Sequence, residues 1–539
     1  MEGPAEARCD GFLIDDGGVF YSTENETIGV CSPLFLEAIT RNQDGHDWGK
    51  LFRLVDPEGS VKYYHMRSAV LAAKQQVVIA DLVNKGLEVS GHPKAKGLLM
   101  QYLRSVKVKA SMLSTAKPGW INGSFVLPHE SFGPEKAIYS GNFGDHGFGM
   151  AGDWKANVGK LCSGNPLLVF AASTAFAAPM LAVAEMEGGG FHFRGASSMG
   201  KSTALEVAAS VCGSAAKYVL NWDSTKNALE EVAEAHNDCL MVIDELGIVD
   251  PEIIGPTLYM IANGHGKSRM NQTKRRWRAL FLTSGEVSLA EHMAEAGREP
   301  KKGQEVRLLD ISADAGAGMG LFEKLHSFDS PAAFANHLKA ATRQHYGTPL
   351  KRFLEYLTSA HDKITTDCRL SVDGFIERVV PPNVSGEVPR AARRFGLVAV
   401  AGELATARKL TGWKPGEAIA AAEKCFGAWM EHRRTFDPVA KAVDRVRTYI
   451  LANEAKFEIV GGDPLPNRSG YKKNGSYLID PEVFQDEVCA GLKHDEIAVG
   501  LERAGLLRTS GKNRLKKQER IGGDLVYFYS VDGRILEAA

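Results

Sequence analysis

The sequence contains few cysteines and almost no net charge. Its eight cysteines are scattered, without a Cys-x-x-Cys pair or a Cys/His cluster at metal-ligand spacing. Reduced thiols in a cytoplasmic setting therefore fit best, and no zinc site is expected. The formal charge of −1 excludes a globally basic surface, so any contact with nucleic acid must use a local patch. With 539 residues, 44% of them hydrophobic, the chain suffices for three or four soluble domains of about 100–200 residues each.

Long uncharged runs are also scarce. The first eight residues have neither an apolar core nor a basic leader, so no signal peptide is expected. Residues 167–184 carry no charge, but the run is rich in alanine and contains Ser173, Thr174 and Pro179. We expect a buried helix there rather than a membrane span, and hence no membrane partner.

The clearest motif occupies residues 195–202, which are Gly-Ala-Ser-Ser-Met-Gly-Lys-Ser. They match the phosphate-loop pattern G-x-x-x-x-G-K-[ST] at every position, between a strand-like stretch at 190–194 and a helix-forming stretch at 203–211. We expect backbone N–H groups and the Lys201 ammonium to bind a triphosphate, with Mg²⁺ on the Ser202 hydroxyl. The predicted nucleotide-binding residues are Gly195, Ala196, Ser197, Ser198, Met199, Gly200, Lys201, Ser202 and Thr203.

A second motif lies at the end of an apolar run. Residues 239–243 are apolar without interruption, and Asp244 and Glu245 follow them. Such a run is typical of a buried parallel strand, and its carboxylates then lie at the C-terminal edge of the sheet. In phosphate-loop ATPases the Asp holds Mg²⁺ and a Glu polarises the attacking water. The two motifs together predict ATP binding and hydrolysis.

The next apolar strand, 279–282, ends at Thr283 and Ser284. Additional-strand ATPases carry a polar residue at this strand end, between the γ-phosphate and the acidic pair. Both hydroxyls are candidates for this sensor, and position alone does not choose between them. The alternative is that a hydroxyl only caps the end of the strand.

Arginines at two places are candidates for contact with a nucleotide. Arg307 begins a strand over 305–311, where ring-forming ATPases place an arginine finger that reaches a neighbour's site, and Arg298 is the alternative. A second group of arginines lies at the start of a long apolar helix that ends at Ala407. This group consists of Arg390, Arg393 and Arg394. The helix dipole disfavours cations in the first turn of a helix. Binding of an external anion would explain why these arginines are there, and we therefore expect a second sensor of the nucleotide here. The alternative is a solvated face.

Residues 264–278, called here the basic segment, carry six Lys and Arg residues and no acid. Residues 270–273 lie midway, as the turn of a hairpin would. We expect this hairpin to neutralise DNA phosphates and its binding to weaken steeply with salt. Its place in the sequence is that of the pore hairpin of hexameric helicases, and a solvated loop is the alternative. The predicted DNA-binding residues are Lys267, Arg269, Lys274, Arg275 and Arg276.

With these motifs, the chain resembles a family of helicase-like ATPases of bacterial mobile elements and phages, long catalogued as a domain of unknown function. The matching stretches are 119–128, 195–202, 222–225, 244–245, 284–286, the Arg307 segment and 393–405, and the similarity covers most of residues 10–535. The family is related to AAA+ replicative helicases, which implies a ring, here a homo-hexamer. Its members often sit beside primases, which implies a primase or an origin-binding protein as partner.

The predicted fold class is α/β, with an AAA+ P-loop ATPase core that has three layers and a mainly parallel sheet. We expect an N-terminal α+β domain (1–150), the ATPase core (151–320), a helical lid domain (321–435) and a winged-helix-like domain (436–539). Residues 313–320 are expected to be a flexible break. A second basic stretch, 512–517, is expected between the arms of the wing. It could contact duplex DNA or simply be solvated, and the sequence does not decide between the two.

The expected function is an ATP-dependent DNA helicase or translocase that replicates a mobile element. It would use ATP and Mg²⁺ and act on single-stranded and forked DNA, with Glu245, Thr283 or Ser284, Arg307, Arg390 and Arg393 as its catalytic residues. Asp244 and Ser202 would hold the metal. The alternative is an ATP-switched protein that binds an origin and recruits a partner without processive unwinding. A small-molecule kinase fits less well, since it leaves Glu245 and the basic segment without a role.

Overall fold

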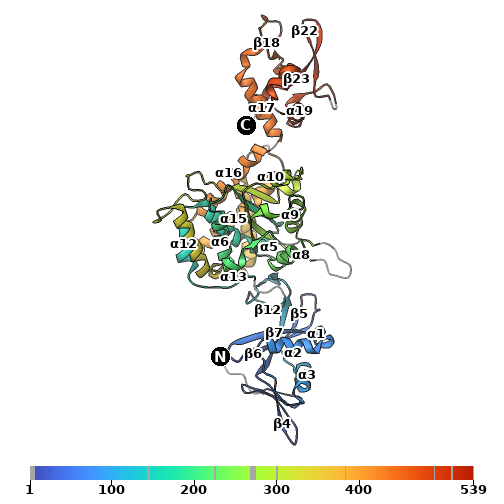
Figure 1. Cartoon of the computed structure of the whole chain (residues 1–539), viewed down its shortest axis with the longest axis vertical. Helices are drawn as coiled ribbons and strands as arrows, with labels where there is room; N and C mark the ends of the chain where they lie inside the picture. The colour runs from blue at the N-terminus through green and yellow to red at the C-terminus, as the bar shows by residue number, and fades with distance from the viewer. Residues whose placement is uncertain are drawn as a thin grey trace. The chain divides into compact units, whose positions relative to one another are not determined.

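The computed structural model describes residues 7–141, 146–223, 226–266, 275–298, 301–382, 384–436, 438–490, 492–511 and 514–537. The chain forms two compact units, Met1–Phe426 and Gly427–Ala539 (Figure 1). Both units combine helices and strands, and the first contains a parallel sheet, so the α/β class expected from the sequence is confirmed.

Two sheets form the N-terminal part of the first unit. One is antiparallel, with the order β1 (Ala7–Cys9), β2 (Phe12–Asp15), β3 (Gly18–Ser22) and β4 (Thr27–Cys31). The other has the order β12 (Ala137–Tyr139), β8 (Ser111–Thr115), β5 (Leu34–Arg41), β6 (Gly49–Val55) and β7 (Val61–Arg67). The helices α1 (Ser68–Ala73), α2 (Gln75–Asn84) and α3 (Ala95–Ser105) lie between β7 and β8 in the sequence.

The sequence spaces apolar residues over 67–115 at three and four, which predicts helix throughout, and this prediction is wrong at its end. Residues Ser111–Thr115 form β8, which pairs in parallel with both β5 and β12. A short segment of mixed polarity has little preference of its own, so its pairing partners decide its conformation. A further small sheet, with the order β11 (Ser131–Phe132), β10 (Ser124–Val126) and β9 (Gly119–Ile121), follows β8 in the chain.

A five-stranded parallel sheet forms the centre of the first unit. Its order is β14 (Leu220–Asn221), β15 (Leu240–Asp244), β16 (Leu280–Gly285), β13 (Gly189–Arg194) and β17 (Leu308–Ser312). Every neighbouring pair is parallel. The C-terminal ends of β13, β15 and β16 therefore meet at one edge, which is the side where parallel sheets place their sites.

Helices cover both faces of this sheet. On one face α5 (Pro166–Val183) and α6 (Lys201–Cys212) contact β15 and β16, and α15 (Glu387–Ala407) contacts α5. On the other face α8 (Lys226–Ala235), α9 (Ile254–Asn263) and α10 (Leu289–Glu295) share a hydrophobic core with Met241, Ile243 and Phe281. The sheet thus lies between two helical layers.

Helix α5 is apolar on all sides. By length and composition it is the one helix in the described part of the chain that could cross a membrane, and 89% of it is buried inside the protein. Its neighbours α6 and α15 cover it (Figure 1). A helix that is hydrophobic all round and buried is a core helix, as expected for residues 167–184.

The remaining helices of the first unit follow the sheet. The long ones are α12 (Pro331–Gln344), α13 (Thr348–Ser359), α14 (His361–Val379), α15 and α16 (Glu417–Phe436). The boundary between the two units falls within α16. The shorter helices are η1 (Lys155–Gly159), α4 (Lys160–Cys162), α7 (Ala215–Tyr218), η2 (Leu246–Ile248) and α11 (Lys302–Glu305).

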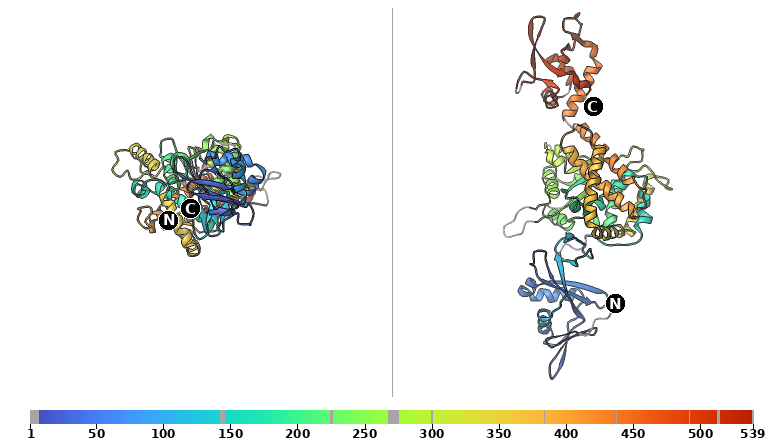
Figure 2. Two further views of the ribbon diagram at one scale, coloured as in Figure 1. Left: turned by 90° about the horizontal axis from the view of Figure 1, so that it is seen from below. Right: turned by 180° about the vertical axis from the view of Figure 1, so that it is seen from behind.

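The C-terminal unit combines helices with one sheet. Its main helices are α17 (Pro438–Ala452) and α19 (His494–Arg503), with the short helices η3 (Glu454–Lys456), α18 (Pro481–Val483), η4 (Phe484–Val488) and η5 (Gly533–Leu536). The sheet has the order β18 (Phe457–Ile459), β19 (Gly470–Lys473), β20 (Ser476–Ile479), β23 (Asp524–Asp532) and β21 (Leu507–Arg508). Strand β22 (Lys517–Ile521) pairs with β23 as a hairpin that extends from the unit (Figure 2).

The basic stretch lies between two strands that pair, β21 and β23, as the sequence predicts, and the strand β22 follows it. The turn of the β22–β23 hairpin consists of Gly522 and Gly523, both with positive φ. Residues 514–516 of that stretch precede β22, and residues 512–513 lie outside the described residues. Two glycines form a tight turn readily, which places the bend after the basic residues.

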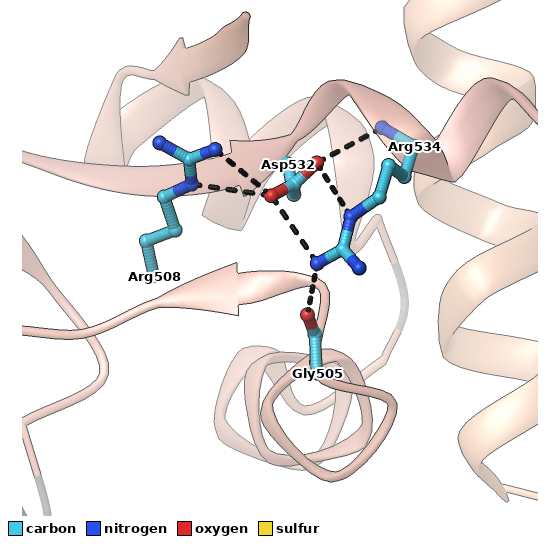
Figure 3. Close-up of polar contacts among 4 residues, drawn as sticks. All are labelled: Gly505, Arg508, Asp532 and Arg534. Atoms are coloured by element: carbon cyan, nitrogen blue, oxygen red, sulfur yellow. Dashed lines mark hydrogen bonds and ion pairs between the residues drawn. The ribbon is translucent and has the colours of Figure 1, made fainter.

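A buried carboxylate fastens the end of β23 in the C-terminal unit. Asp532 accepts hydrogen bonds from the side chains of Arg534 and Arg508, and Arg534 also donates to the carbonyl of Gly505 (Figure 3). The Arg534 side chain and N–H, together with Arg508, lower the pKa of Asp532 to about 2. The three segments around 505–508, 532 and 534 are thereby held together.

Candidate nucleotide site

The phosphate loop lies between the C-terminal end of β13 and the first turn of α6. Ser198 and Gly200 have positive φ, +65° and +91°, and Gly200 directly precedes the helix. These left-handed residues let the chain reverse at the helix N-terminus, where free N–H groups gather. The Lys201 ammonium donates to the carbonyls of Gly195 (2.6 Å) and Ala196 (2.7 Å). Lys201 therefore folds over its own loop.

Side-chain alternation decides which face of the sheet each residue of the acidic strand meets. In β15, Met241 and Ile243 belong to the core formed with α8 and α9. Asp244, the next residue, therefore points to the opposite face, which α6 covers. Burial raises the pKa of Glu206, one turn beyond Ser202 on α6, and the Asp244 charge adds to this rise. Asp244 is thus close to the helix that begins at the phosphate loop.

The same alternation separates Thr283 from Ser284. Thr283 is fully buried on the α8 and α9 face, where its hydroxyl accepts a hydrogen bond from the Trp222 indole N–H at 2.8 Å. Ser284 points the other way, and its hydroxyl donates to the Asp244 carboxylate. The sequence left both residues open, and the structure brings only Ser284 to the acidic pair.

Glu245 has an unusual backbone conformation. Its φ is +60° and its ψ is 72°, in the left-handed region that residues with a side chain seldom adopt. Its N–H lies 3.0 Å from Asp244 Oδ1 and 3.5 Å from Ser284 Oγ. Strained backbone of this kind is found most often at functional sites.

The two ends of residues 313–322, where the sequence predicts a flexible break at 313–320, are bonded to the phosphate loop and to the strand before it. The N–H of Ala313 donates to the carbonyl of Arg194 at 2.7 Å, and that of Leu321 donates to Met199 at 2.9 Å. Phe322 is buried, and a Cβ at Gly200 would lie 3.2 Å from its ring. A glycine- and alanine-rich composition signals flexibility only when nothing packs against it. This segment is a part of the site that the sequence motifs did not reveal.

The donor set fits a nucleotide with a divalent cation. The α6 N-terminus and the Lys201 ammonium suit phosphate oxygens, and the Asp244 carboxylate with the Ser202 hydroxyl provides the oxygen ligands that Mg²⁺ prefers. Lys201 already contacts two carbonyl oxygens in the loop, which a phosphate group can replace. The other predicted loop residues, Ala196 to Met199 and Thr203, lie in the loop or in the first turn of α6.

The arginine-finger candidate lies away from its own phosphate loop. Arg307 precedes β17, at the N-terminal edge of the sheet, where its carbonyl accepts from the Gly190 N–H. Its guanidinium donates to Asn263 (2.8 Å) and to the Gly303 carbonyl (2.6 Å), and it lies over the Tyr259 ring. The alternative, Arg298, is exposed and 3.8 Å from Glu252. Arg307 cannot serve its own chain's nucleotide in this arrangement.

The structure does not bring the arginines of α15 to the phosphate loop. Arg394 is buried at the N-terminal edge of the sheet, where it donates to the carbonyls of Gly188 and Val306. Burial, with the nearby Arg307 charge, lowers the pKa of Arg394 to about 10. Arg390 is 3.7 Å from Glu187, and Arg393 pairs with Asp373 at 2.8 Å. The expected second sensor is corrected accordingly: these arginines are occupied by local partners at the far edge.

The described ends of the basic segment form the base of a hairpin. His265 and Arg276 are bridged in antiparallel fashion, and Gly266 donates its N–H to Arg275. Arg275 pairs with Glu231 (3.0 Å) and Glu234 (3.6 Å) of α8, so its charge is largely compensated. Arg276 is exposed. The other predicted DNA-binding residues, Lys267, Arg269 and Lys274, lie outside the described residues.

Comparisons with known proteins agree with this architecture. Residues 14–278 match the family model described as "Domain of unknown function (DUF927)". A solved structure described as "SCCmec type IV Cch - active helicase" is 19% identical, with a TM-score of 0.65 over 99% of this chain and 100% of that chain. That likeness shows a common fold. No curated protein sequence matches the chain.

Two further solved structures match over a smaller share of the chain. The C-terminal region of NrS-1 is 10% identical, with a TM-score of 0.27 over 68% of this chain and 87% of that chain. JCV helicase with a bound inhibitor is 12% identical, with a TM-score of 0.20 over 42% of this chain and 65% of that chain. The resemblance inferred from the motifs is confirmed: residues 14–278 match the family model of a domain of unknown function, and the chain shares the fold of the SCCmec protein.

Proposed function

We propose that the protein is an ATP-driven DNA helicase or translocase that acts in the replication of a mobile element. The observation that carries this proposal is the meeting of five residues at one edge of the parallel sheet. Lys201 and Ser202 open α6, and Asp244, Glu245 and Ser284 end the adjacent strands β15 and β16. The fold shared with a protein described as an active helicase supports it.

Each of these residues has a role in hydrolysis of ATP. Lys201 compensates the negative charge of the β- and γ-phosphates, and Ser202 with Asp244 holds Mg²⁺. When bound, the metal neutralises charge on the phosphate oxygens. Glu245 orients the attacking water and accepts its proton. Ser284, bonded to Asp244, keeps that carboxylate in place and senses the γ-phosphate.

The order of the strands supports a ring-forming AAA+ core. Strand β16 lies between the strand of the phosphate loop, β13, and the strand of the acidic pair, β15. This inserted strand is the mark of additional-strand ATPases. In a homo-hexamer the Arg307 guanidinium would leave Tyr259 and Asn263 and enter the neighbour's site, where it stabilises charge on the transferred phosphoryl group.

DNA would be held by the basic segment, with Arg276 as its best-supported contact. Lys267, Arg269 and Lys274 remain predicted contacts. Hydrolysis around the ring would move these segments along one strand of single-stranded or forked DNA. The C-terminal unit, with α19 and the β22–β23 hairpin, is proposed to be a winged helix that contacts duplex DNA, an origin or a primase partner.

The test is unwinding of tailed DNA forks by the full chain with ATP and Mg²⁺. Wild type should unwind forks of one tail polarity, 3′ or 5′. Glu245→Gln should bind ATP but unwind neither. Hydrolysis without unwinding by wild type would refute the helicase and favour the ATP-switched origin-binding protein. Salt-sensitive duplex binding would then be the next property to measure.

A further inference from the structure

An ion pair between a buried carboxylate and a partly exposed arginine joins the starts of β15 and β16. Asp238, two residues before β15, has a side chain only 2% exposed, and its Oδ1 lies 3.1 Å from the Nε of Arg278. Arg278 lies two residues before β16. The opposite ends of these strands carry Asp244, Glu245 and Ser284. The pair therefore lies at the base of the basic segment and on the strands that form the nucleotide site.

The same carboxylate also binds a loop from the N-terminal part of the chain. The N–H of Trp120 lies 3.2 Å from Asp238 Oδ2. Asn237 donates to the carbonyl of Pro118 at 2.7 Å and accepts from the N–H of Arg278 at 3.0 Å. Residues 117–120, called here the joint loop, comprise the end of the turn after β8 and the first two residues of β9.

Lys117 extends this contact to the basic segment. Its ammonium donates to the carbonyl of Arg276 at 3.0 Å. Burial lowers the pKa of Lys117, while the charges of Asp238 and Glu234 oppose this effect. This hydrogen bond joins the joint loop directly to the backbone of the basic segment.

The joint loop fits its place only with glycine at position 119. Gly119 has a φ of +111°, and a Cβ there would overlap both the Asp238 carboxylate and the Asn237 amide. On its other side the Trp120 indole N–H donates to the carbonyl of Pro179 in α5 at 2.8 Å. The loop is therefore fastened to the sheet layer, to α5 and to the basic segment at once.

We propose that Asp238 is a positioning residue that couples the N-terminal region to the basic segment, through the joint loop and Lys117. The segment lies where this joint holds it, so displacement of the N-terminal region changes how DNA stimulates hydrolysis. This second statement rests on the proposed function, whereas the joint itself does not. Charged groups buried with this many partners hold one geometry, because each partner lost leaves a charge without compensation.

The experiment compares full-length wild type with Lys117→Met, Lys117→Arg and Asp238→Asn. Arg352→Met is the matched control, because Arg352 forms an exposed ion pair on α13. Two quantities are measured for each protein. One is amide hydrogen exchange at 115–121 and 275–279, and the other is ATP turnover against the concentration of a single-stranded oligonucleotide.

Lys117→Met and Asp238→Asn should raise exchange in both segments while basal turnover stays as in wild type. The oligonucleotide concentration for half-maximal stimulation should rise about tenfold, the scale of a lost hydrogen bond to a charged group. Lys117→Arg, which keeps a donor, should restore most of the response. A variant that combines Lys117→Met with Asp238→Asn should need no more oligonucleotide for half-maximal stimulation than the more impaired single variant, since both changes break the same joint.

The outcomes separate the joint from the proposed function. If DNA does not stimulate wild type but exchange at 275–279 rises in Lys117→Met, the helicase proposal fails and the joint stands. If exchange at 275–279 is unchanged in Lys117→Met and Asp238→Asn, the joint is refuted. If exchange rises but a DNA-stimulated wild type and its variants respond alike, the contact is structural only and the coupling is refuted.

Discussion

At the scale of single residues, Ser284 and Thr283 offer a test of the site. Replacement of Ser284 by Ala should lower the turnover of ATP up to about 100-fold, because the Asp244 carboxylate loses the hydroxyl that holds it. Thr283→Val should keep turnover. It should instead lower the free energy of unfolding by about 1–3 kcal/mol, since the Trp222 indole N–H loses its acceptor. Steady-state kinetics and urea unfolding of both variants give the answer, and equal loss of turnover would contradict the assignment.

The phosphate loop was predictable because its chemistry lies in one contiguous stretch. Gly195, Gly200 and Lys201 define it by spacing alone. The choice between Thr283 and Ser284 was not, because it depends on which helices cover each face of β16. The arginines of α15 looked suited to a nucleotide. The sequence does not show that Glu187 and Asp373 lie close enough in the fold to form ion pairs with two of them.

At the scale of elements, the base of the basic segment divides its arginines by role. Arg276→Ala should weaken binding of single-stranded DNA and reduce the slope of log affinity against log salt by about one, because one phosphate contact is lost. Arg275→Ala should leave that slope nearly unchanged, since Glu231 and Glu234 already compensate its charge. Fluorescence titrations at several salt concentrations measure both. Equal slopes for the two variants would exclude Arg276 as a phosphate contact.

The C-terminal unit carries a pH-dependent fastening at Asp532. Its folded pKa is lowered to about 2, below the ordinary value near 4. The contribution to stability is therefore complete above about pH 4 and is lost as the pH falls toward 2. The protection of residues 505–508 and 530–534 against hydrogen exchange should fall across that window, in wild type and in the exposed-site control Asp524→Asn alike. In Asp532→Asn these amides should exchange faster already at pH 7, and an unchanged rate would contradict the fastening.

Apolar runs predicted the strands of the parallel sheet well, as β13, β15 and β16 show. Segments whose conformation depends on distant partners were harder to predict. Residues 313–320 resemble a flexible linker, but the N–H of Ala313 bonds to Arg194 at the end of β13, and the N–H of Leu321 bonds to Met199 of the phosphate loop. Residues 111–115 become a strand only because β5 and β12 lie on either side. In each case the deciding contact is with a residue far away in the sequence.

At the scale of the whole molecule, the position of Arg307 makes a prediction about assembly. It lies at the sheet edge opposite to its own phosphate loop and contacts Tyr259 and Asn263, so any role in hydrolysis requires a second subunit. Arg307→Ala and Lys201→Ala should each abolish turnover when assayed alone.

Mixing the two variants should restore turnover, because a ring that contains both has interfaces where an intact Arg307 meets an intact Lys201. At equal amounts and random assembly, about a quarter of the interfaces have this composition, so about a quarter of wild-type turnover is expected if interfaces act independently. The measurement is ATP hydrolysis after the variants are mixed under conditions that permit subunit exchange, with each variant diluted into itself as control. No recovery, with exchange verified by labelled subunits, would place Arg307 outside the neighbour's site and leave Arg298 as the remaining candidate.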